Sequence, residues 1–133
     1  MKEEIIIEGY RKIISKKNKM KVFRNRLYKT KDVRDFEDYV SEIALKVMEK
    51  KKILKVPVSL RLEITFGDKR RRDLQNCFDT ICDALNSIVY EDDSQIVSLT
   101  GSKKYEKGMW LFRIIVREEE EEEEDVIHAT EGR

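Results

Sequence analysis

Apolar and polar residues alternate with a period of two over residues 58–66. The apolar positions of this segment are Val58, Leu60, Leu62, Ile64 and Phe66. This period is typical of a β-strand with one buried face. Apolar runs at residues 5–10, 95–100 and 109–116 predict three further strands, with Gly101 in the turn between the last two.

Two other segments repeat their apolar residues every three or four positions. These residues are Val33, Phe36, Val40, Ile43, Ala44, Val47 and Met48 in residues 32–50, and Leu74, Cys77, Phe78, Ile81, Leu85 and Ile88 in residues 74–88. Such a stripe predicts an amphipathic helix in each segment. Thr30 or Asp32 is placed to cap the start of the first helix. The pattern as a whole predicts an α+β fold, a small mixed β-sheet with two main helices.

Charge is distributed unevenly along the 133 residues, although the formal net charge is only +1. Residues 118–133 hold nine of the 27 acidic residues and one of the 28 Lys and Arg residues, so residues 1–117 carry a net charge of +9. We expect residues 1–117 to fold as one domain and residues 118–133 to be an acidic, disordered tail. A basic body favours a polyanionic partner such as nucleic acid, and a surface charged only for solubility is the alternative.

The segment 11–29 is a basic loop between the first predicted strand and the first predicted helix. It contains nine Lys or Arg residues, interleaved with Phe23 and Tyr28. Basic side chains suit a phosphate backbone and aromatic ones suit unstacked bases, so the segment is a candidate DNA-binding loop. A solvated hairpin is the alternative. The candidate DNA-binding residues here are Lys16, Lys17, Lys19, Lys21, Arg24 and Arg26.

The sequence contains neither a long apolar stretch nor an N-terminal pattern typical of a signal peptide. We therefore expect a soluble, cytoplasmic protein with no membrane contact. Its two cysteines, Cys77 and Cys82, and its one histidine, His128, lack the spacing of zinc ligands. Both cysteines are expected to be reduced, with Cys77 in the core.

Carboxylates flank the second predicted helix. Asp73 follows the basic run Lys69-Arg70-Arg71-Arg72, and the pair Asp92-Asp93 comes after the helix. Carboxylates hold hard cations and neighbouring positive charges hold phosphates, which are the two requirements of phosphodiester chemistry. Asp73 is also a routine N-cap, and an aspartate such as Asp93 is common in turns. Their combination nevertheless favours metal-dependent phosphodiester chemistry, with Asp73 and Asp93 as the leading candidates.

Three short segments resemble the RusA family of Holliday junction resolvases, which is common in prophages. They are Arg71-Arg72-Asp73-Leu74-Gln75-Asn76, Asp83-Ala84-Leu85-Asn86 and Asp92-Asp93-Ser94-Gln95-Ile96, in family order and near-family spacing. Ser15-Lys16-Lys17-Asn18 is similar to the N-terminal Ser-x-x-Asn region of that family. The order of strands and helices is similar over about residues 4–117.

The resemblance implies a homodimeric, metal-dependent endonuclease of DNA recombination and repair. Its partner would be branched DNA, four-way junctions cut by paired nicks, and its cofactor Mg²⁺ or Mn²⁺. Asp73 and Asp93 match family catalytic, metal-binding aspartates, and Asp92 and Gln75 are further candidate metal ligands. The resemblance also implies DNA-phosphate contacts by Lys69, Arg70, Arg71 and Arg72, and supporting roles for Asn76, Asp79 and Asp83.

Two positions differ from the family pattern. Its second motif aspartate is Gln75 here, which brings no charge and should lower metal affinity. Its catalytic lysine, six residues after Asp73, is Asp79 here. Asp79 is a candidate to replace the charge missing at Gln75, and Lys69, Lys103 or Lys104 to replace the lost cation. The alternatives are therefore a catalytically weakened or inactive junction-binding protein of this fold, or a dimeric domain whose charges only solubilise it.

The length of the second helix bears on the metal site. A helix over residues 74–88 would be about 22 Å long. The linker 89–92 spans at most about 14 Å. Asp73 and Asp93 of one chain could not then share a cation, whereas two antiparallel helices in a dimer would bring Asp73 of one chain to Asp93 of the other. A shorter helix would leave a site within one chain possible.

Overall fold

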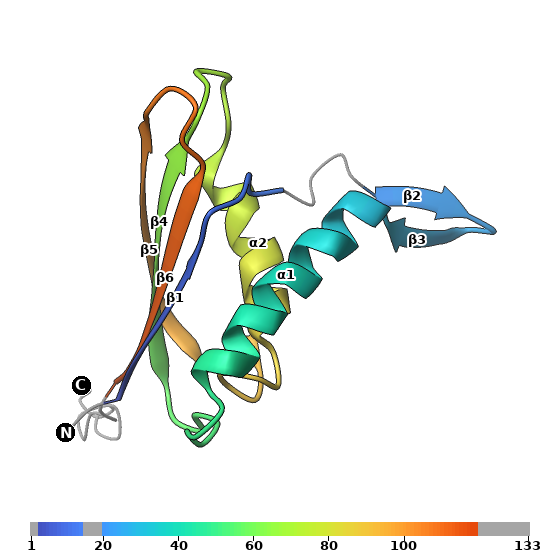
Figure 1. The fold of residues 1–133 in the computed structure, drawn as a ribbon. Coiled ribbons are helices and arrows are strands. Elements are labelled where there is room, and N and C mark those ends of the chain that lie inside the picture. Colours follow the sequence, from blue (N-terminus) through green and yellow to red (C-terminus); the bar gives the residue numbers. More distant parts are fainter. Residues whose placement is uncertain (1–2, 15–19, 120–133) are drawn as a thin grey trace, which may run out of the picture.

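The computed structural model of the protein describes residues 3–14 and 20–119. In chain order its elements are β1 (Glu4–Gly9), β2 (Met20–Phe23), β3 (Arg26–Lys29), α1 (Lys31–Val47), β4 (Val58–Phe66), α2 (Leu74–Leu85), the short 3₁₀ helix η1 (Asp93–Gln95), β5 (Ile96–Tyr105) and β6 (Leu111–Glu118). Figure 1 shows both α-helices on one face of a sheet. The predicted α+β class, with two main helices, is confirmed.

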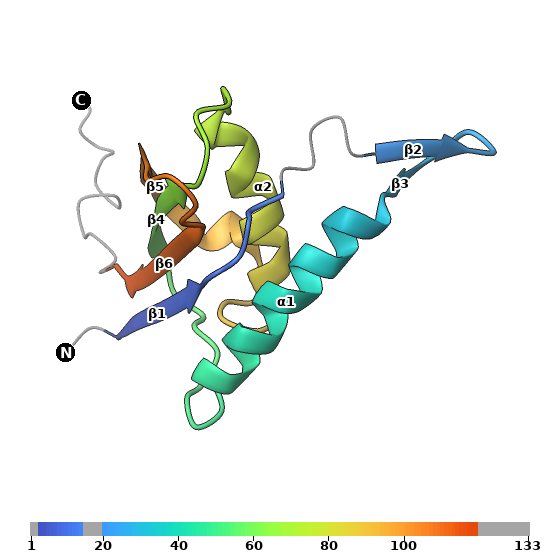
Figure 2. The same cartoon turned by 45° about the horizontal axis from the view of Figure 1, so that its top comes forward.

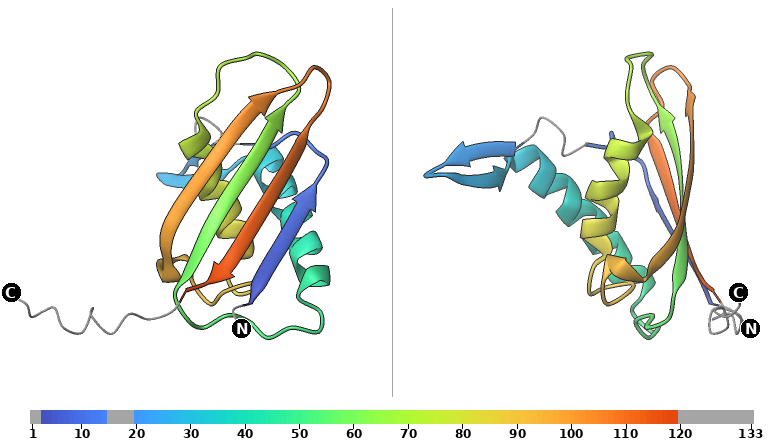
Figure 3. Two further views of the ribbon diagram at one scale, coloured as in Figure 1. Left: turned by 90° about the vertical axis from the view of Figure 1, so that its left-hand side faces the viewer. Right: turned by 180° about the vertical axis from the view of Figure 1, so that it is seen from behind.

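The main sheet has the strand order β1-β6-β4-β5. β4 pairs in parallel with β5, whereas β1 with β6 and β6 with β4 are antiparallel, so the sheet is mixed as predicted. Parallel neighbours need a crossover connection, and α2 provides it between β4 and β5. Figure 3 shows β5 at one edge of the sheet, with the helices behind the strands.

The core lies between the helices and the sheet. The alternating apolar residues of β4 face it, and all five positions from Val58 to Phe66 are buried there. Phe36 of α1 packs edge-on against Phe112 of β6, with ring centroids 5.6 Å apart. Ser41 of α1 donates a hydrogen bond of 2.9 Å to the carbonyl of Ala84, which ties the two helices together.

In the part of the chain that the structure describes, no helix covers the other face of the sheet, where arginines pair with glutamates. Arg113 of β6 pairs with Glu8 of β1 across the strands, and Arg61 of β4 pairs with Glu63 of the same strand. Ladders of opposite charge of this kind suit a solvated sheet face. The excess positive charge of residues 1–117 therefore does not lie on this face. It lies in the loops and at the ends of the helices and strands.

Three predicted boundaries are wrong. α1 ends at Val47 and not at residue 50. Gly101 lies inside β5 and not in a turn, because the strand continues to Tyr105. A Cβ at Gly101 would lie 2.9 Å from the Leu74 side chain and 3.0 Å from that of Phe78, so the glycine permits close approach of α2. α2 in turn ends at Leu85 and not at Ile88.

The early end of α2 has a clear local cause. Ser87 adopts a left-handed conformation, with a φ of 67°, and its N–H donates to the carbonyl of Tyr90. The reversal buries Val89 and Tyr90 completely. The apolar residues that follow position 85 thus enter the core from a turn and do not continue the helical stripe.

The basic segment contains a two-stranded antiparallel hairpin, β2–β3, whose turn at Arg24 and Asn25 has positive φ angles of 53° and 63°. The hairpin projects beyond the start of α1, away from the sheet (Figures 1 and 2). At its base, Lys29 forms an ion pair with Glu37 of α1 at 2.7 Å. Residues 20–29 are therefore a hairpin, the structure named above as the alternative, and DNA contact by it stays a prediction.

The start of α1 and the burial of Cys77 agree with the sequence. Thr30, one of the two candidate caps, occupies the N-cap position of α1, but its side chain makes no capping hydrogen bond. Cys77 is buried, as predicted, and Cys82 is buried too, with both thiols free. Among the residues that the structure describes, no helix is both long and apolar enough to cross a membrane.

Candidate functional site

The loop between β4 and α2 carries the basic run and ends at Asp73. Asp73 is the N-cap of α2, and its carboxylate accepts a hydrogen bond of 3.0 Å from the backbone N–H of Gln75. The capping role expected of an aspartate at a helix start is thus confirmed. Asp73 is nevertheless exposed, at the positive end of the α2 dipole and directly after three arginines.

Arg72 differs from the two arginines before it. Its guanidinium donates two hydrogen bonds to the carboxylate of Asp68, at 2.5 and 3.3 Å. It also lies 5.0 Å from the ring centroid of Phe66 and 5.1 Å from that of Trp110. Only 15% of the side chain is exposed. Arg72, Asp68, Phe66 and Trp110, here called the Arg72 cluster, therefore hold the loop against the ends of β4 and β6.

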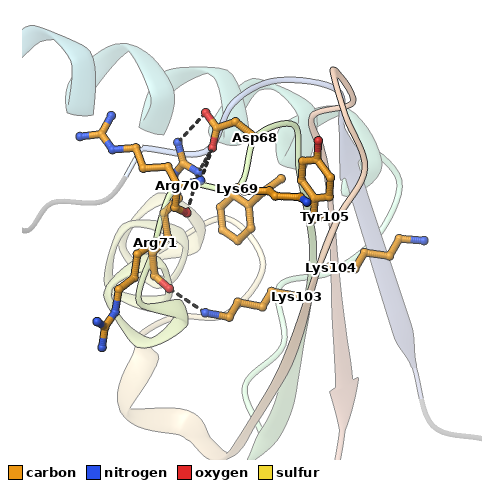
Figure 4. Close-up of a pocket in the computed structure, with 9 residues that line it drawn as sticks. Asp68, Lys69, Arg70, Arg71, Lys103, Lys104 and Tyr105 are labelled. Carbon is orange, nitrogen blue, oxygen red and sulfur yellow. Dashed lines mark hydrogen bonds and ion pairs between the residues drawn. The ribbon is translucent and has the colours of Figure 1, made fainter.

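Two further effects accompany the Arg72 cluster. The hydrogen bonds from Arg72 lower the pKa of Asp68, so this carboxylate stays ionised to a lower pH than an ordinary aspartate. Lys103 of β5 donates a hydrogen bond of 2.7 Å to the backbone carbonyl of Arg72 (Figure 4). The loop is thus attached to β5 as well, whereas Arg70 and Arg71 extend into solvent.

A basic pocket of about 390 Å³ lies between this loop and the end of β5. Its lining residues are Phe66, Asp68, Lys69, Arg70, Arg71, Arg72, Lys103, Lys104 and Tyr105. Six of the nine carry positive charge, and the single acid is paired with Arg72. Lys69 lies with its ammonium 5.2 Å from the centroid of the Tyr105 ring (Figure 4). This combination of cations and an aromatic ring can bind a nucleic acid.

Tyr105 is a member of this pocket that the sequence did not reveal. The predicted strand stopped at residue 100, which left Tyr105 outside any element. The useful signal was the apolar spacing of Val97, Leu99 and Tyr105, which continues the period of two across Gly101 and Lys103. Lys103 and Lys104, named above only as candidate cations, are placed at the pocket by the same extension of β5.

A second group of carboxylates lies toward the other end of α2. Asp79, Asp83 and Asp93 line one hollow of about 290 Å³, together with Phe78, Cys82, Ile96 and Leu99. Asp79 and Asp83 are one helical turn apart, and Asp93 reaches the same hollow from η1. Asp73 is not among these lining residues. We call Asp79, Asp83 and Asp93 the distal carboxylates.

The residues of the acidic segment 91–95, which precedes β5, have different structural roles. Asp92 caps η1 by accepting a hydrogen bond from the N–H of Ser94. Hydrogen bonds from the side chain and from the backbone of Ser94 lower the pKa of Asp92. Gln95 accepts hydrogen bonds from the N–H groups of Glu91 and Asp92 and donates two to the carbonyls of Leu54 and Val56. Asp92 and Gln95 thus shape the turn that presents Asp93 to the hollow.

The cysteine beside the distal carboxylates is not placed for chemistry. Burial raises the pKa of the Cys82 thiol to about 11, and that of Cys77 also to about 11. Both thiols are therefore protonated at neutral pH, and neither is an activated nucleophile. The hydroxyl of Tyr90, itself fully buried, donates to the carbonyl of Cys82 at 3.0 Å and stiffens this part of α2.

The structure therefore separates the two leading candidates for a metal site. α2 has 12 residues and is about 18 Å long, with Asp73 at its start, Asp79 near its middle and Asp83 in its last turn, while Asp93 lies in η1. Within residues 3–14 and 20–119, no three or more Asp, Glu, His and Cys side chains are grouped so that they could hold a metal ion. Gln75 is exposed beside Asp73, not in the distal hollow.

The remaining candidate DNA-binding residues fall into two groups. Lys16, Lys17 and Lys19 lie outside the described residues. Lys21 and Arg26 belong to the hairpin strands, but only their backbone is described, and Arg24 is exposed at the hairpin turn. Asn76, a candidate supporting residue, donates its backbone N–H to the carbonyl of Asp73 at 3.1 Å, within the first turn of α2.

Comparison with known proteins gives one match to a family. The family model described as Endodeoxyribonuclease RusA matches residues 10–117. This interval contains the loop that ends at Asp73, the whole of α2, the distal carboxylates and the basic pocket. No curated protein matches the chain.

Replacing Arg72 by lysine should destabilise the protein, because an ammonium cannot make the two-pronged contact with Asp68 and stacks less well on Phe66 and Trp110. We expect a loss of about 1–2 kcal/mol in the free energy of unfolding. Arg71→Lys is the matched control, since Arg71 is exposed, and it should change stability by less than about 0.5 kcal/mol. Urea unfolding monitored by Trp110 fluorescence measures both. Equal stability of the two variants would contradict a structural role for Arg72.

Proposed function

The chain belongs to the RusA family of endodeoxyribonucleases, and from this premise we propose that it is a structure-selective nuclease that resolves four-way DNA junctions by paired nicks. The observation that carries the proposal is the extent of the family match, residues 10–117. It includes both carboxylate groups and the exposed cations beside Asp73. A nuclease needs these two kinds of group close to one phosphate.

DNA would be held first through its phosphates. Lys69, Arg70 and Arg71 are exposed in one short loop, at the N-terminal end of α2. Backbone N–H groups at a helix start and neighbouring cations both favour phosphate binding. The projecting hairpin adds Arg24 at its turn, away from the body. The net charge of +9 on residues 1–117 would attract DNA to this surface at low ionic strength.

The proposed cofactor is Mg²⁺, or Mn²⁺ in its place. Mg²⁺ is commonly bound by only one or two carboxylates together with substrate phosphates and water, so it does not need a cage of protein ligands. Asp73 fits this use because its carboxylate is exposed beside phosphate-binding cations. When bound, the ion would activate a water molecule and offset the charge that develops on the phosphate. Asp73 would orient the ion, and Arg70 and Arg71 would hold the DNA strand.

We propose further that the active form is a homodimer. β5 is an edge strand, and its apolar residues Val97 and Leu99 are 64% and 50% exposed. Exposed apolar edge strands are usually covered, since they otherwise promote aggregation. Leu99 lies in the same hollow as Phe78 of α2, so the apolar surface is continuous from strand to helix. A second copy of the chain, placed on this surface by a two-fold axis, would cover both.

The two-fold arrangement would also complete the site. Two antiparallel α2 helices would set Asp73 of one chain beside the distal carboxylates of the other, including Asp93 of the partner subunit. Asp79 would then contribute the charge that is missing at Gln75, because it lines the same hollow as Asp93. A four-way junction is itself two-fold symmetric, so a dimer with two sites matches paired nicks in opposed strands.

A second candidate function is junction binding without cleavage. Its support is chemical: Gln75 brings no charge beside Asp73, and Asp79 stands where the family has a cation. The basic pocket, the hairpin and the Arg72 cluster would serve this function equally well. The distinction between the two functions therefore depends on cleavage and not on binding.

The direct test uses a labelled four-way junction, with Mg²⁺ or Mn²⁺, and the Asp73→Asn variant beside the wild type. Asparagine caps helices as well as aspartate, so the variant should keep α2 and its stability. We expect paired nicks from the wild type and none from Asp73→Asn. The variant should bind the junction as tightly as the wild type or more tightly, because a negative charge beside DNA is lost.

Other results of this test are equally clear. A wild type that selects junctions over linear duplex but nicks with neither ion would replace the nuclease by the binding-only function. If the wild type shows no preference for junctions, both the nuclease and the binding-only functions are contradicted. The charges would then serve solubility.

Gln75→Asp tests whether the site is short of one negative charge. A carboxylate holds Mg²⁺ better than an amide oxygen, so the variant should nick at lower Mg²⁺ concentration than the wild type. Gln75→Asn is the control, because asparagine matches aspartate in side-chain length but carries no charge. It should show no such gain. Titration of nicking rate against Mg²⁺ measures the effect, with junction affinity in EDTA as a check on binding. A Gln75→Asp variant that needs as much Mg²⁺ as Gln75→Asn would show that position 75 does not approach the ion.

A further inference from the structure

The basic pocket has a size and an exposed aromatic ring that phosphate binding alone would not require. Its volume, about 390 Å³, lies within the usual range for small-molecule sites, and one wall carries an accessible aromatic ring. Tyr105, the last residue of β5, is 43% exposed. We propose that the pocket receives one unpaired nucleotide of the branched DNA, with its base against Tyr105 and its phosphate on Lys69. This inference rests on the proposed action on branched DNA.

The two aromatic residues of the pocket have different roles. Phe66 and Tyr105 are register partners at the ends of β4 and β5. Phe66 is only 5% exposed and is covered by Arg72 and Trp110. Among the described residues, the Tyr105 ring meets the exposed ammonium of Lys69 and stays accessible, so it is the surface on which a base can stack. Stacking on an aromatic side chain tolerates every base, which suits an enzyme that recognises structure.

Lys69 marks where the phosphate would lie. Its ammonium is 5.2 Å from the Tyr105 ring centroid, a cation–π contact on the same ring that the base would use. A base that stacks on Tyr105 would displace the exposed Lys69 ammonium from the ring. The flexible lysine side chain would still reach the phosphate of the same nucleotide. Arg70 and Arg71 follow it in the chain and can hold the phosphates on either side.

The rest of the pocket is held by contacts within the protein. Asp68, the only acid in the lining, is neutralised by Arg72 and so does not repel a phosphate. Lys103 anchors the loop to β5 through the carbonyl of Arg72. A preformed site of this kind loses little conformational entropy on binding, which favours affinity.

The location connects the pocket to the choice of substrate. The pocket shares its loop with Asp73, so a nucleotide held there lies beside the strand that Asp73 would address. Unpaired or unstacked nucleotides are available at a branch point, whereas a continuous duplex must be unstacked to provide one. Tyr105 would therefore act as a specificity-determining residue for branched over linear DNA.

The test measures binding in EDTA, so that it does not depend on cleavage. Dissociation constants for a four-way junction and for a linear duplex of the same arm sequence are compared for the full chain. Tyr105→Ala should weaken junction binding by about tenfold and duplex binding by less than about twofold. Tyr105→Phe, which keeps the ring, should behave as the wild type. Tyr10→Ala, which removes an exposed tyrosine outside the pocket, should change neither constant.

A further variant guards against loss of folding. Tyr105→Leu keeps apolar bulk but has no ring, and it should weaken junction binding as Tyr105→Ala does, with an unchanged circular dichroism spectrum. The pocket proposal is overturned if junction preference survives in Tyr105→Leu, or if Tyr105→Phe loses it. A wild type with no preference for junctions would instead overturn the proposed function itself, so the two failures are distinguishable.

Discussion

Strand β5 pairs in parallel with β4, and this pairing decides where the candidate site residues around α2 lie. Parallel neighbours require a crossover, and α2 is that crossover, running back along the sheet from the end of β4 to the start of β5. The loop that ends at Asp73 therefore lies beside Tyr105, at the carboxyl ends of both strands. Asp93, which precedes β5, must lie at the other end of α2. One chain thus presents a basic pocket at one end and the distal carboxylates at the other.

In the described part of the molecule, the role of each positively charged side chain depends on where it lies. Arg72 is enclosed by Phe66, Trp110 and Asp68 and holds the loop in place. Its neighbours Arg70 and Arg71 are exposed, and they can bind phosphate because Arg72 keeps their loop attached. On the sheet face opposite the helices, by contrast, arginines are paired with glutamates across the strands. Net charge alone indicated a polyanionic partner, and packing decides which cations can reach it.

Local patterns in the sequence were sufficient for much of this structure. The period of two over β4, the helical stripes of α1 and α2, and the capping role of Asp73 follow from neighbouring residues alone. Gly101 misled because a glycine within a strand and a glycine in a turn look alike, and only the packing of α2 distinguishes them. Arg72 could not be separated from Arg70 and Arg71, since its partner Trp110 is distant in sequence and joins it only through the fold. The parallel pairing, and with it Tyr105, was hidden for the same reason.

The central claim is that a working site needs carboxylates from two chains. The most direct measurement uses mixed dimers of the Asp73→Asn and Asp93→Asn variants, purified through two different tags and tested on a labelled junction with Mg²⁺. In a shared arrangement, one of the two sites of each mixed dimer keeps both aspartates. The account predicts that single nicks return in the mixed dimer, while each variant alone is inert. A mixed dimer as inert as both parents, beside a wild type that nicks, would contradict it and place each site within one chain.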